Sequence, residues 1–419
     1  MVNPGDKVLV KTKDKDFEGI YITKPELLSQ DEIVLKLKTG YNIGIDKKSI
    51  KDIKVIEEYK EKKYSKKTVK KNPKLPNVLI MSTGGTISSK VDYTTGGVSA
   101  EYDASDFVEM CPELRDLANI DAKKTMSIMS EDIKPSEWIQ IAEDINKELK
   151  KYDGIVLTMG TDTLGYTAAA LSFMIKANKP VVITAAQRSI DRGSSDAFFN
   201  LISAVNVAAN WEGAGVVSCM HGKSSDEFCT LLNGTKIRKL HSSRRDAFRP
   251  VNDLEFAKVY GAGKIEAVNK EYDKRSDKSE LNNSFEDKVG LIFIHPGIKK
   301  EVFDNYKNYK GIILAGTGFG HIPEDCYKAV KKLVDSGVFV GMTSQCLYGK
   351  TSSTVYSPLR RLSLEVGVVY LKDMLPETAY VKLGWVLSQK KKLEDVKELM
   401  LTNVAGEINE RIDFDSFLN

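Results

Sequence analysis

A hydroxyl nucleophile could be presented by "MSTGGTIS" (81–88), where two glycines lead from an apolar run into Thr86. The loop is neither GxGxxG nor GxxxxGK[ST] and lacks the lysine of a P-loop, so a phosphate cradle is disfavoured. A tight bend without chemistry stays open, because plain turns use glycine freely. The third alternative is a backbone whose free N–H groups stabilise an oxyanion beside Thr86, which suits acyl transfer.

A second polar stretch, "MGTDTLGYT" (159–167), follows another apolar run. Asp162 could simply cap the next helix, since aspartate and threonine are preferred N-caps. In the catalytic alternative, Thr161, Asp162 and a lysine relay a proton from a threonine hydroxyl. Lys236 and Lys239 are both candidates for that lysine, and either could instead be a solvated surface residue.

The chain offers little for other hydrolytic chemistries. Its four histidines show neither HxxxH nor HExxH spacing, its five cysteines form no CxxC pair, and no GxSxG elbow follows a strand. We therefore expect no metal site and no Ser-His-Asp triad. The net charge of +4 from 62 basic and 58 acidic residues argues against a chain that is basic throughout and binds nucleic acid along its length. No run of about 18 apolar residues occurs, so we expect a soluble, cytoplasmic protein without a membrane segment.

Long apolar strands alternate with helices after residue 77, which predicts a parallel sheet with helices on both faces. Sites in such sheets form beyond the carboxyl ends of the strands. The stretches at 83–88, 129–133 and 159–167, and the basic stretch 234–248 after the strand ending near Met220, are therefore expected at one edge. In detail, we expect a helix over 106–120 and a strand over 124–130.

Composition divides the chain further. Short alternating runs before residue 58 predict a compact all-β module, which we interpret as a small SH3-like barrel. Residues 60–74 hold eight lysines and one acid, as in a solvated linker or a segment attracted to a polyanion such as RNA. The predicted division is a β module (1–58), a lysine-rich linker (59–76), a large α/β domain with the site (77–265), a connection (266–289) and a smaller α/β domain (290–419).

The motifs "TGGTIS", "MSEDI", "MGTDTLGYTAAAL" and "TKIRKLHSSRRDAF", in this order, resemble the bacterial-type L-asparaginase family over about residues 77 to 419. The resemblance implies an asparaginase-like, doubly wound two-domain α/β fold and an amidohydrolase that works through a threonine acyl-enzyme. Met159 stands where the family motif has a histidine, and we expect a change in local packing there.

Roles carried over by this resemblance fall on eight positions. Thr86 is implied as the nucleophile, with Thr161, Asp162 and Lys239 as the proton relay. Tyr93 resembles the mobile-loop tyrosine that covers the site. Ser130 and Glu131 match the pair that holds the α-carboxylate and α-ammonium of the substrate, and Ala186 is implied to offer a backbone carbonyl to the leaving amide.

The β module and lysine-rich linker before the first α/β strand resemble the glutaminase subunits of archaeal glutamyl-tRNA(Gln) amidotransferases. The implied activity is hydrolysis of glutamine, with ammonia passed to a partner, the GatE subunit, which uses ATP and Mg²⁺ to convert Glu-tRNA(Gln) to Gln-tRNA(Gln). No cofactor is implied for this chain itself. A homodimer through the asparaginase-like domains is also implied, with tRNA(Gln) bound through the complex. The alternatives are a stand-alone cytoplasmic L-asparaginase and a non-catalytic RNA-binding scaffold that kept an asparaginase-like fold.

Overall fold

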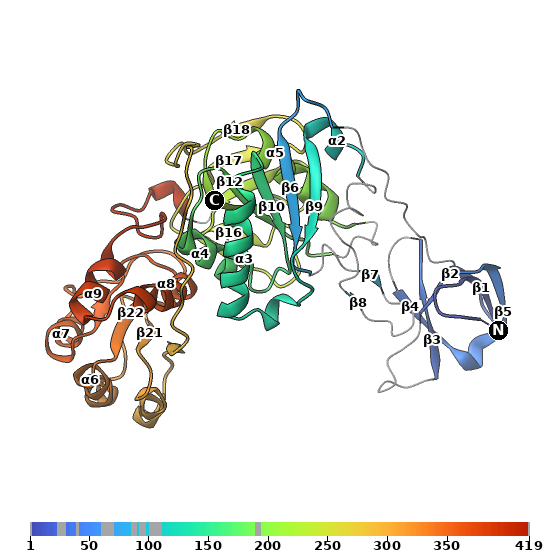
Figure 1. The fold of residues 1–419 in the computed structure, drawn as a ribbon. Helices are drawn as coiled ribbons and strands as arrows, with labels where there is room; N and C mark the ends of the chain where they lie inside the picture. Colours follow the sequence, from blue (N-terminus) through green and yellow to red (C-terminus); the bar gives the residue numbers. More distant parts are fainter. Residues whose placement is uncertain are drawn as a thin grey trace.

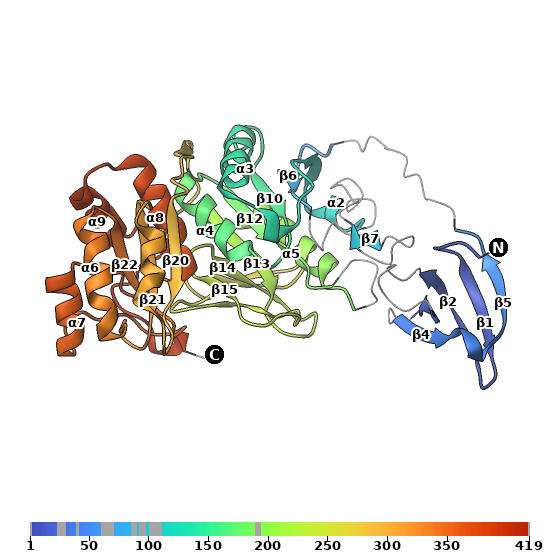
Figure 2. The same ribbon diagram turned by 90° about the horizontal axis from the view of Figure 1, so that it is seen from below.

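The protein is described here from a computed structural model. The structure describes residues 2–22, 31–38, 42–59, 71–84, 90–91, 98–99, 111–188 and 194–417. Figures 1 and 2 show three successive parts, each built around a sheet.

The N-terminal part is a five-stranded antiparallel sheet, in which four strands form a meander and the last returns to pair with the first. Alternate residues such as Val8, Val10 and Leu35 are buried in its small core, as period-2 patterning predicts. The expected all-β module is confirmed. Its strands, in sheet order, are β4 (Asn42–Asp46), β3 (Glu32–Lys36), β2 (Asp16–Ile22), β1 (Lys7–Thr12) and β5 (Ile50–Glu57).

An eight-stranded sheet forms the centre of the molecule (Figure 1). Five neighbouring strands are parallel, as expected: β9 (Asn119–Lys124), β6 (Asn77–Ser82), β10 (Gly154–Thr158), β12 (Pro180–Thr184) and β13 (Gly215–His221). An antiparallel edge continues from β13: β14 (Cys229–Asn233), β17 (Ala257–Val259) and β18 (Ile265–Ala267).

Helices cover both faces of this sheet, which confirms the doubly wound architecture. In β6, Leu79 and Met81 face a core shared with α3 (Pro135–Glu148) and α4 (Leu164–Met174). Val78 and Ile80 face a second core shared with α2 (Leu114–Leu117) and α5 (Ala197–Asn210). Successive side chains of a strand point to opposite faces, so a continuous apolar run is required when both faces are covered.

Two local expectations were wrong. The strand expected over 124–130 lies earlier, at β9, and the later residues lead into the 3-10 turn η3 (Ser130–Asp132). Of the helix expected over 106–120, the described residues form only the four-residue α2. β9 is the edge strand of the sheet and is only partly buried, so it carries none of the apolar run by which the inner strands were recognised.

The C-terminal part is a four-stranded parallel sheet in the order β20 (Val289–Phe293), β21 (Gly311–Gly316), β22 (Phe339–Ser344) and β23 (Val369–Tyr370). One face packs on α6 (Tyr327–Asp335) and the 3-10 segment η4 (Lys300–Tyr306). The other face meets α8 (Pro376–Gln389), whose far side packs on α4 in the same core as the large sheet.

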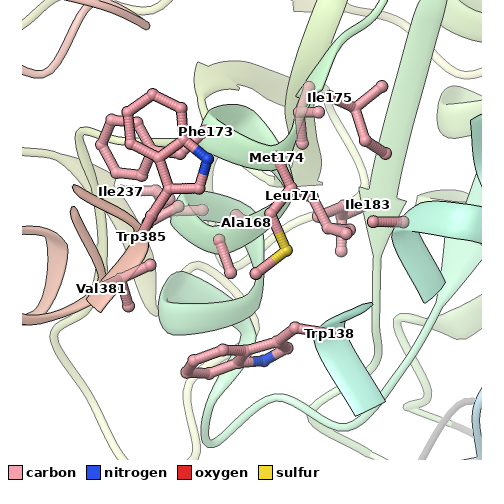
Figure 3. Packing of buried hydrophobic residues seen from close by; sticks show 14 of the residues in the cluster. Trp138, Ala168, Leu171, Phe173, Met174, Ile175, Ile183, Ile237, Val381 and Trp385 are labelled. Carbon is pink, nitrogen blue, oxygen red and sulfur yellow. The ribbon is translucent and has the colours of Figure 1, made fainter. Parts of the chain in front are cut away.

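Figure 3 shows this packing: Trp385 of α8 lies against Phe173 of α4, with ring centroids 5.7 Å apart. The two α/β parts therefore share one continuous core through α8. The remaining elements are short connections and the helix after α8. They are β7 (Lys90–Val91), β8 (Val98–Ser99), β11 (Ile175–Lys176), β15 (Ile237–Lys239), β16 (Phe248–Pro250), β19 (Glu280–Leu281), α7 (Ser357–Arg361), α9 (Leu393–Leu401), η1 (Lys47–Ser49), η5 (Glu324–Cys326), η6 (Leu362–Val366) and η7 (Phe414–Ser416).

The division of the chain at 58, 76, 265 and 289 stays a prediction. Among the described residues, no helix combines the length and apolar character needed to cross a bilayer.

Candidate active site

Three central strands of the large sheet end level with one another. In the parallel register, Thr158 at the end of β10 lies beside Ser82 of β6 and Thr184 of β12. The segments after these strands therefore start from one edge of the sheet, where ligands bind in open parallel sheets.

The turn from β10 to α4 carries Thr161 and Asp162, two of the residues that the sequence analysis predicted as a proton relay. The Nζ of Lys239 donates to Thr161 Oγ1 at 2.9 Å and to Asp162 Oδ1 at 2.7 Å. Thr161 is buried, whereas 65% of the Asp162 side chain is exposed and 15% of Lys239. The amine thus lies between an enclosed hydroxyl and a carboxylate that faces solvent.

This geometry excludes Asp162 as the cap of α4 and Lys236 as the lysine beside the turn. α4 begins after Thr163, and Asp162 holds Lys239 with its carboxylate, so it is not the N-cap residue. Lys236 is fully buried and pairs with Asp373 at 2.5 Å. Of the two candidate lysines, Lys239 is therefore the one that reaches the β10–α4 turn.

Lys239 reaches this turn by a path that the sequence did not predict. The basic stretch was expected directly after the strand ending near Met220, but β14 intervenes and turns the chain back antiparallel to β13. The stretch then forms β15, which pairs with β16. The strand β14 is as apolar as its neighbours, and its direction depends on pairing rather than on composition.

Ser130 lies against the same turn. It is buried, its Oγ accepts from the backbone N–H of Asp162 at 3.3 Å, and its carbonyl accepts from Thr163 Oγ1 at 2.6 Å. A Cβ placed on Gly160 would lie only 2.7 Å from Ser130 Oγ. Gly160 is therefore required for the close approach of η3 to the turn, a role that the sequence pattern did not indicate. Glu131 follows Ser130 and is exposed.

Ala186 follows β12 and is fully buried. The adjoining backbone is held by the buried carboxylate of Asp196, which accepts from the N–H groups of Gln187 and Arg188 at 3.0 Å. The amide of Asn200 donates to Ala185 O at 2.8 Å. Asp196 was missed because an aspartate before a helix predicts an ordinary cap, whereas here it fixes the preceding segment.

Thr86 and Tyr93 lie outside the described residues. The chain leading to Thr86 is described as far as Gly84, which has φ +105°, a value that favours glycine. The N–H of Thr83 donates to Thr158 O at 3.0 Å. This bond attaches the start of the first glycine loop to the strand that carries the relay turn.

Met159, which stands where the family motif has a histidine, is fully buried and belongs to the core on the α3 and α4 face. Within the described ranges, no group of three His, Cys, Asp or Glu side chains has the arrangement of a metal site.

Three family models match the chain: the asparaginase N-terminal model over residues 77–272, the glutaminase/asparaginase C-terminal model over 288–400 and the GatD N-terminal domain over 2–56. The solved L-asparaginase of Thermococcus kodakarensis has a TM-score of 0.73 and 32% identity, and the match covers 80% of this chain and 100% of that one. L-asparaginase I of Vibrio cholerae O1 biovar eltor has a TM-score of 0.69 and 31% identity, covering 80% and 99%. The fold and these matches define an amidohydrolase of the asparaginase type with an additional N-terminal module.

The curated relatives include that module as well. The glutamyl-tRNA(Gln) amidotransferase D subunit of Pyrococcus abyssi is 47% identical over 100% of this chain and 97% of its own length. The D subunits of Thermococcus kodakarensis and Methanococcus maripaludis are 47% and 44% identical, covering 99% and 98% of this chain and 96% and 99% of theirs. The chain belongs to the family of glutamyl-tRNA(Gln) amidotransferase D subunits.

Proposed function

We propose that this chain is the glutaminase subunit of a glutamyl-tRNA(Gln) amidotransferase. It hydrolyses glutamine to glutamate and ammonia, and the ammonia is passed to a partner protein. The observation that carries the proposal is the contact of Lys239 Nζ with both Thr161 Oγ1 and Asp162 Oδ1 in a chain that also has the GatD N-terminal domain.

In the proposed first step, the Oγ of Thr86 attacks the side-chain amide carbon of glutamine. The hydroxyl proton is transferred to the leaving nitrogen, the C–N bond breaks, and ammonia departs from an ester on Thr86. Water then cleaves the ester and returns the proton to Thr86, so that glutamine and water give glutamate and ammonia. Splitting the hydrolysis in this way replaces one difficult step by two easier ones.

The relay residues supply the base for these steps. Lys239 Nζ lies 2.9 Å from Thr161 Oγ1, so the neutral amine takes the hydroxyl proton that Thr161 gives up, and the resulting ammonium stabilises the negative charge on that oxygen. Asp162 holds the amine in place from the solvent side. Thr161 can then accept a proton from the nucleophilic hydroxyl or from water as a general base.

Four further residues are proposed to bind the substrate. Ser130 and Glu131 hold the α-carboxylate and α-ammonium, with Asp162 also facing the ammonium. Ala186 offers its carbonyl to the amide N–H₂, and Tyr93 covers the site. Support for Ser130 comes from its hydrogen bond with the backbone N–H of Asp162.

The proposed partner is the GatE subunit, which uses ATP and Mg²⁺ to activate tRNA-bound glutamate and accepts the ammonia. No cofactor is proposed for this chain. We further propose a homodimer through the asparaginase-like domains, with tRNA(Gln) bound through the complex in the cytoplasm. The subunit naming of the full-length relatives supports an assembly of several chains.

The test is turnover of glutamine and of asparagine by the purified chain and by its complex with GatE, with and without Glu-tRNA(Gln). We expect glutamine hydrolysis that rises with the partner and the charged tRNA, and loss of glutamine-dependent amidation in Thr86→Ala. An isolated chain that hydrolyses asparagine strongly and ignores tRNA would instead identify a stand-alone L-asparaginase. Continued glutamine-dependent amidation by Thr86→Ala would contradict the enzymatic role.

A further inference from the structure

The segment that ends on Lys239 lies between the two α/β parts of the molecule. The strand β15 is three residues long, and its pairing partner β16 is equally short. Ile237, at its start, is buried in the core shared by α4 and α8, and Figure 3 shows it in one cluster with Val381 and Trp385 of α8. So short a strand gives little rigidity of its own.

Three residues before Lys239 are attached to the C-terminal part. Thr378 Oγ1 donates to the carbonyl of Thr235 at 2.8 Å. The Nζ of Lys236 pairs with Asp373 at 2.5 Å, with both side chains buried. Arg238 Nη2 pairs with Glu377 Oε1 at 2.9 Å.

All three partners belong to one short stretch of chain. Asp373 lies just before α8, and Glu377 and Thr378 lie in its first turn. The second carboxylate oxygen of Glu377 is buried and has no hydrogen-bond partner in the described part of the chain. Such a group would be costly without a compensating interaction, so the pair with Arg238 is the contact that holds this carboxylate.

The opposite side of β15 faces the relay. Gly165, in the first turn of α4, approaches the carbonyl of Ile237, since a Cβ there would be 3.2 Å from that oxygen. The side chain of Lys239 reaches across to Thr161 and Asp162, just before that turn. Side chains alternate between the two sides of a strand, so Arg238, which is paired with α8, and Lys239, which contacts Thr161 and Asp162, extend from opposite sides of the same short strand.

We propose that the start of α8 is a positioning element for Lys239, and that Arg238 and Glu377 are positioning residues of the glutaminase reaction. This inference rests on the proposed role of Lys239 in that reaction. The C-terminal part then sets the distance between Lys239 Nζ and Thr161 Oγ1. A shift of α8 changes this distance, and α8 need not contact the substrate to do so.

The experiment uses the complex of the full chain with GatE and measures kcat and KM for glutamine in Arg238→Gln, Glu377→Gln and the reversed pair Arg238→Glu/Glu377→Arg. We expect kcat to fall about tenfold in each single variant, because small misplacements of catalytic groups are costly. KM should change less than about twofold, and the reversed pair should recover most of kcat. The matched control is Lys123→Gln, which breaks a similarly half-buried ion pair between β9 and α3.

Unchanged kcat in both single variants, or a loss no greater than that of Lys123→Gln at equal thermal stability, would overturn the positioning role. A reversed pair as inactive as the single variants would overturn it as well. A wild-type complex that hydrolyses neither glutamine nor asparagine would refute the proposed function itself. An active wild type with unaffected variants would refute only this inference.

Discussion

Replacing Gly160 by alanine tests how closely the turn after β10 must approach Ser130. The added methyl would lie 2.7 Å from Ser130 Oγ and 2.8 Å from Ser130 Cβ, whereas ordinary contacts begin at 3.4 Å. Ser130 is buried, and both its Oγ and its carbonyl accept hydrogen bonds from the turn between β10 and α4. The side chain therefore has little room to withdraw, and the backbone of residues 160–162 must move.

The size of the effect follows from these distances. Lengthening the Cβ contact from 2.8 Å to 3.4 Å needs a shift of about 0.6 Å, which exceeds the tolerance of about 0.5 Å for a catalytic constellation. We expect the variant to lose about 10- to 100-fold in kcat/KM for glutamine, because Thr161 and Asp162 move away from Lys239. Overpacking of this kind also destabilises the fold by about 1–3 kcal/mol.

The assay compares kcat/KM with the midpoint of denaturant unfolding in the complex with GatE. Gly44→Ala is the control, because its added methyl meets only the end of the Glu32 side chain at 3.1 Å in the N-terminal module. Activity of Gly160→Ala within about twofold of wild type, at unchanged stability, would refute the steric reasoning.

Three further outcomes are expected. Lys239→Met should lower glutamine kcat by about 10²- to 10⁴-fold with little change in unfolding; a loss below about tenfold, measured at saturating glutamine, would contradict the relay. Burial raises the pKa of Asp253 from 3.8 to about 6 in the folded state. The protonated carboxyl therefore stabilises the folded state fully below about pH 3.8, and this contribution is lost as the pH rises through about 6. Asp253→Asn should therefore raise the free energy of unfolding by about 3 kcal/mol at about pH 8 and by little at about pH 4, and equal shifts at both pH values would count against this. Lys382→Met should lower the free energy of unfolding by about 3–5 kcal/mol, because it leaves the fully buried carboxylate of Glu407 without its ion-pair partner. Lys382→Met/Glu407→Gln should restore part of this free energy in denaturant titrations. A double variant less stable than the single one would disprove the account.

The predicted architecture followed from features that are local in sequence. The apolar run 154–158 and the turn residues after it predicted a buried strand with functional groups at its carboxyl end, and both lie there in the structure. In α6, Tyr327, Val330 and Leu333 are buried, which matches the amphipathic spacing of its apolar residues. A strand that is buried on both faces needs a continuous apolar run, and a helix that is buried on one side needs apolar residues at helical spacing. Both patterns can be recognised directly in the sequence.

Two strands were not predicted where they lie. The edge strand β9 is mixed in polarity, and the antiparallel β14 has the same apolar composition as its parallel neighbours. The direction of a strand is fixed by hydrogen bonding to its neighbours, which residue types do not encode.

The sequence by itself determined the kind of fold, the strand ends at which chemistry is possible and the hydroxyl, carboxylate and amine that could carry it. Tertiary structure decided which lysine lies against the turn that carries Thr161 and Asp162. Lys236 and Lys239 are three residues apart and chemically identical, yet one is held by Asp373 and the other reaches Asp162, 77 residues earlier in the chain. The difference comes from the alternation of a short strand fixed between α4 and α8, because a contact between distant segments depends on the packing of everything that lies between them.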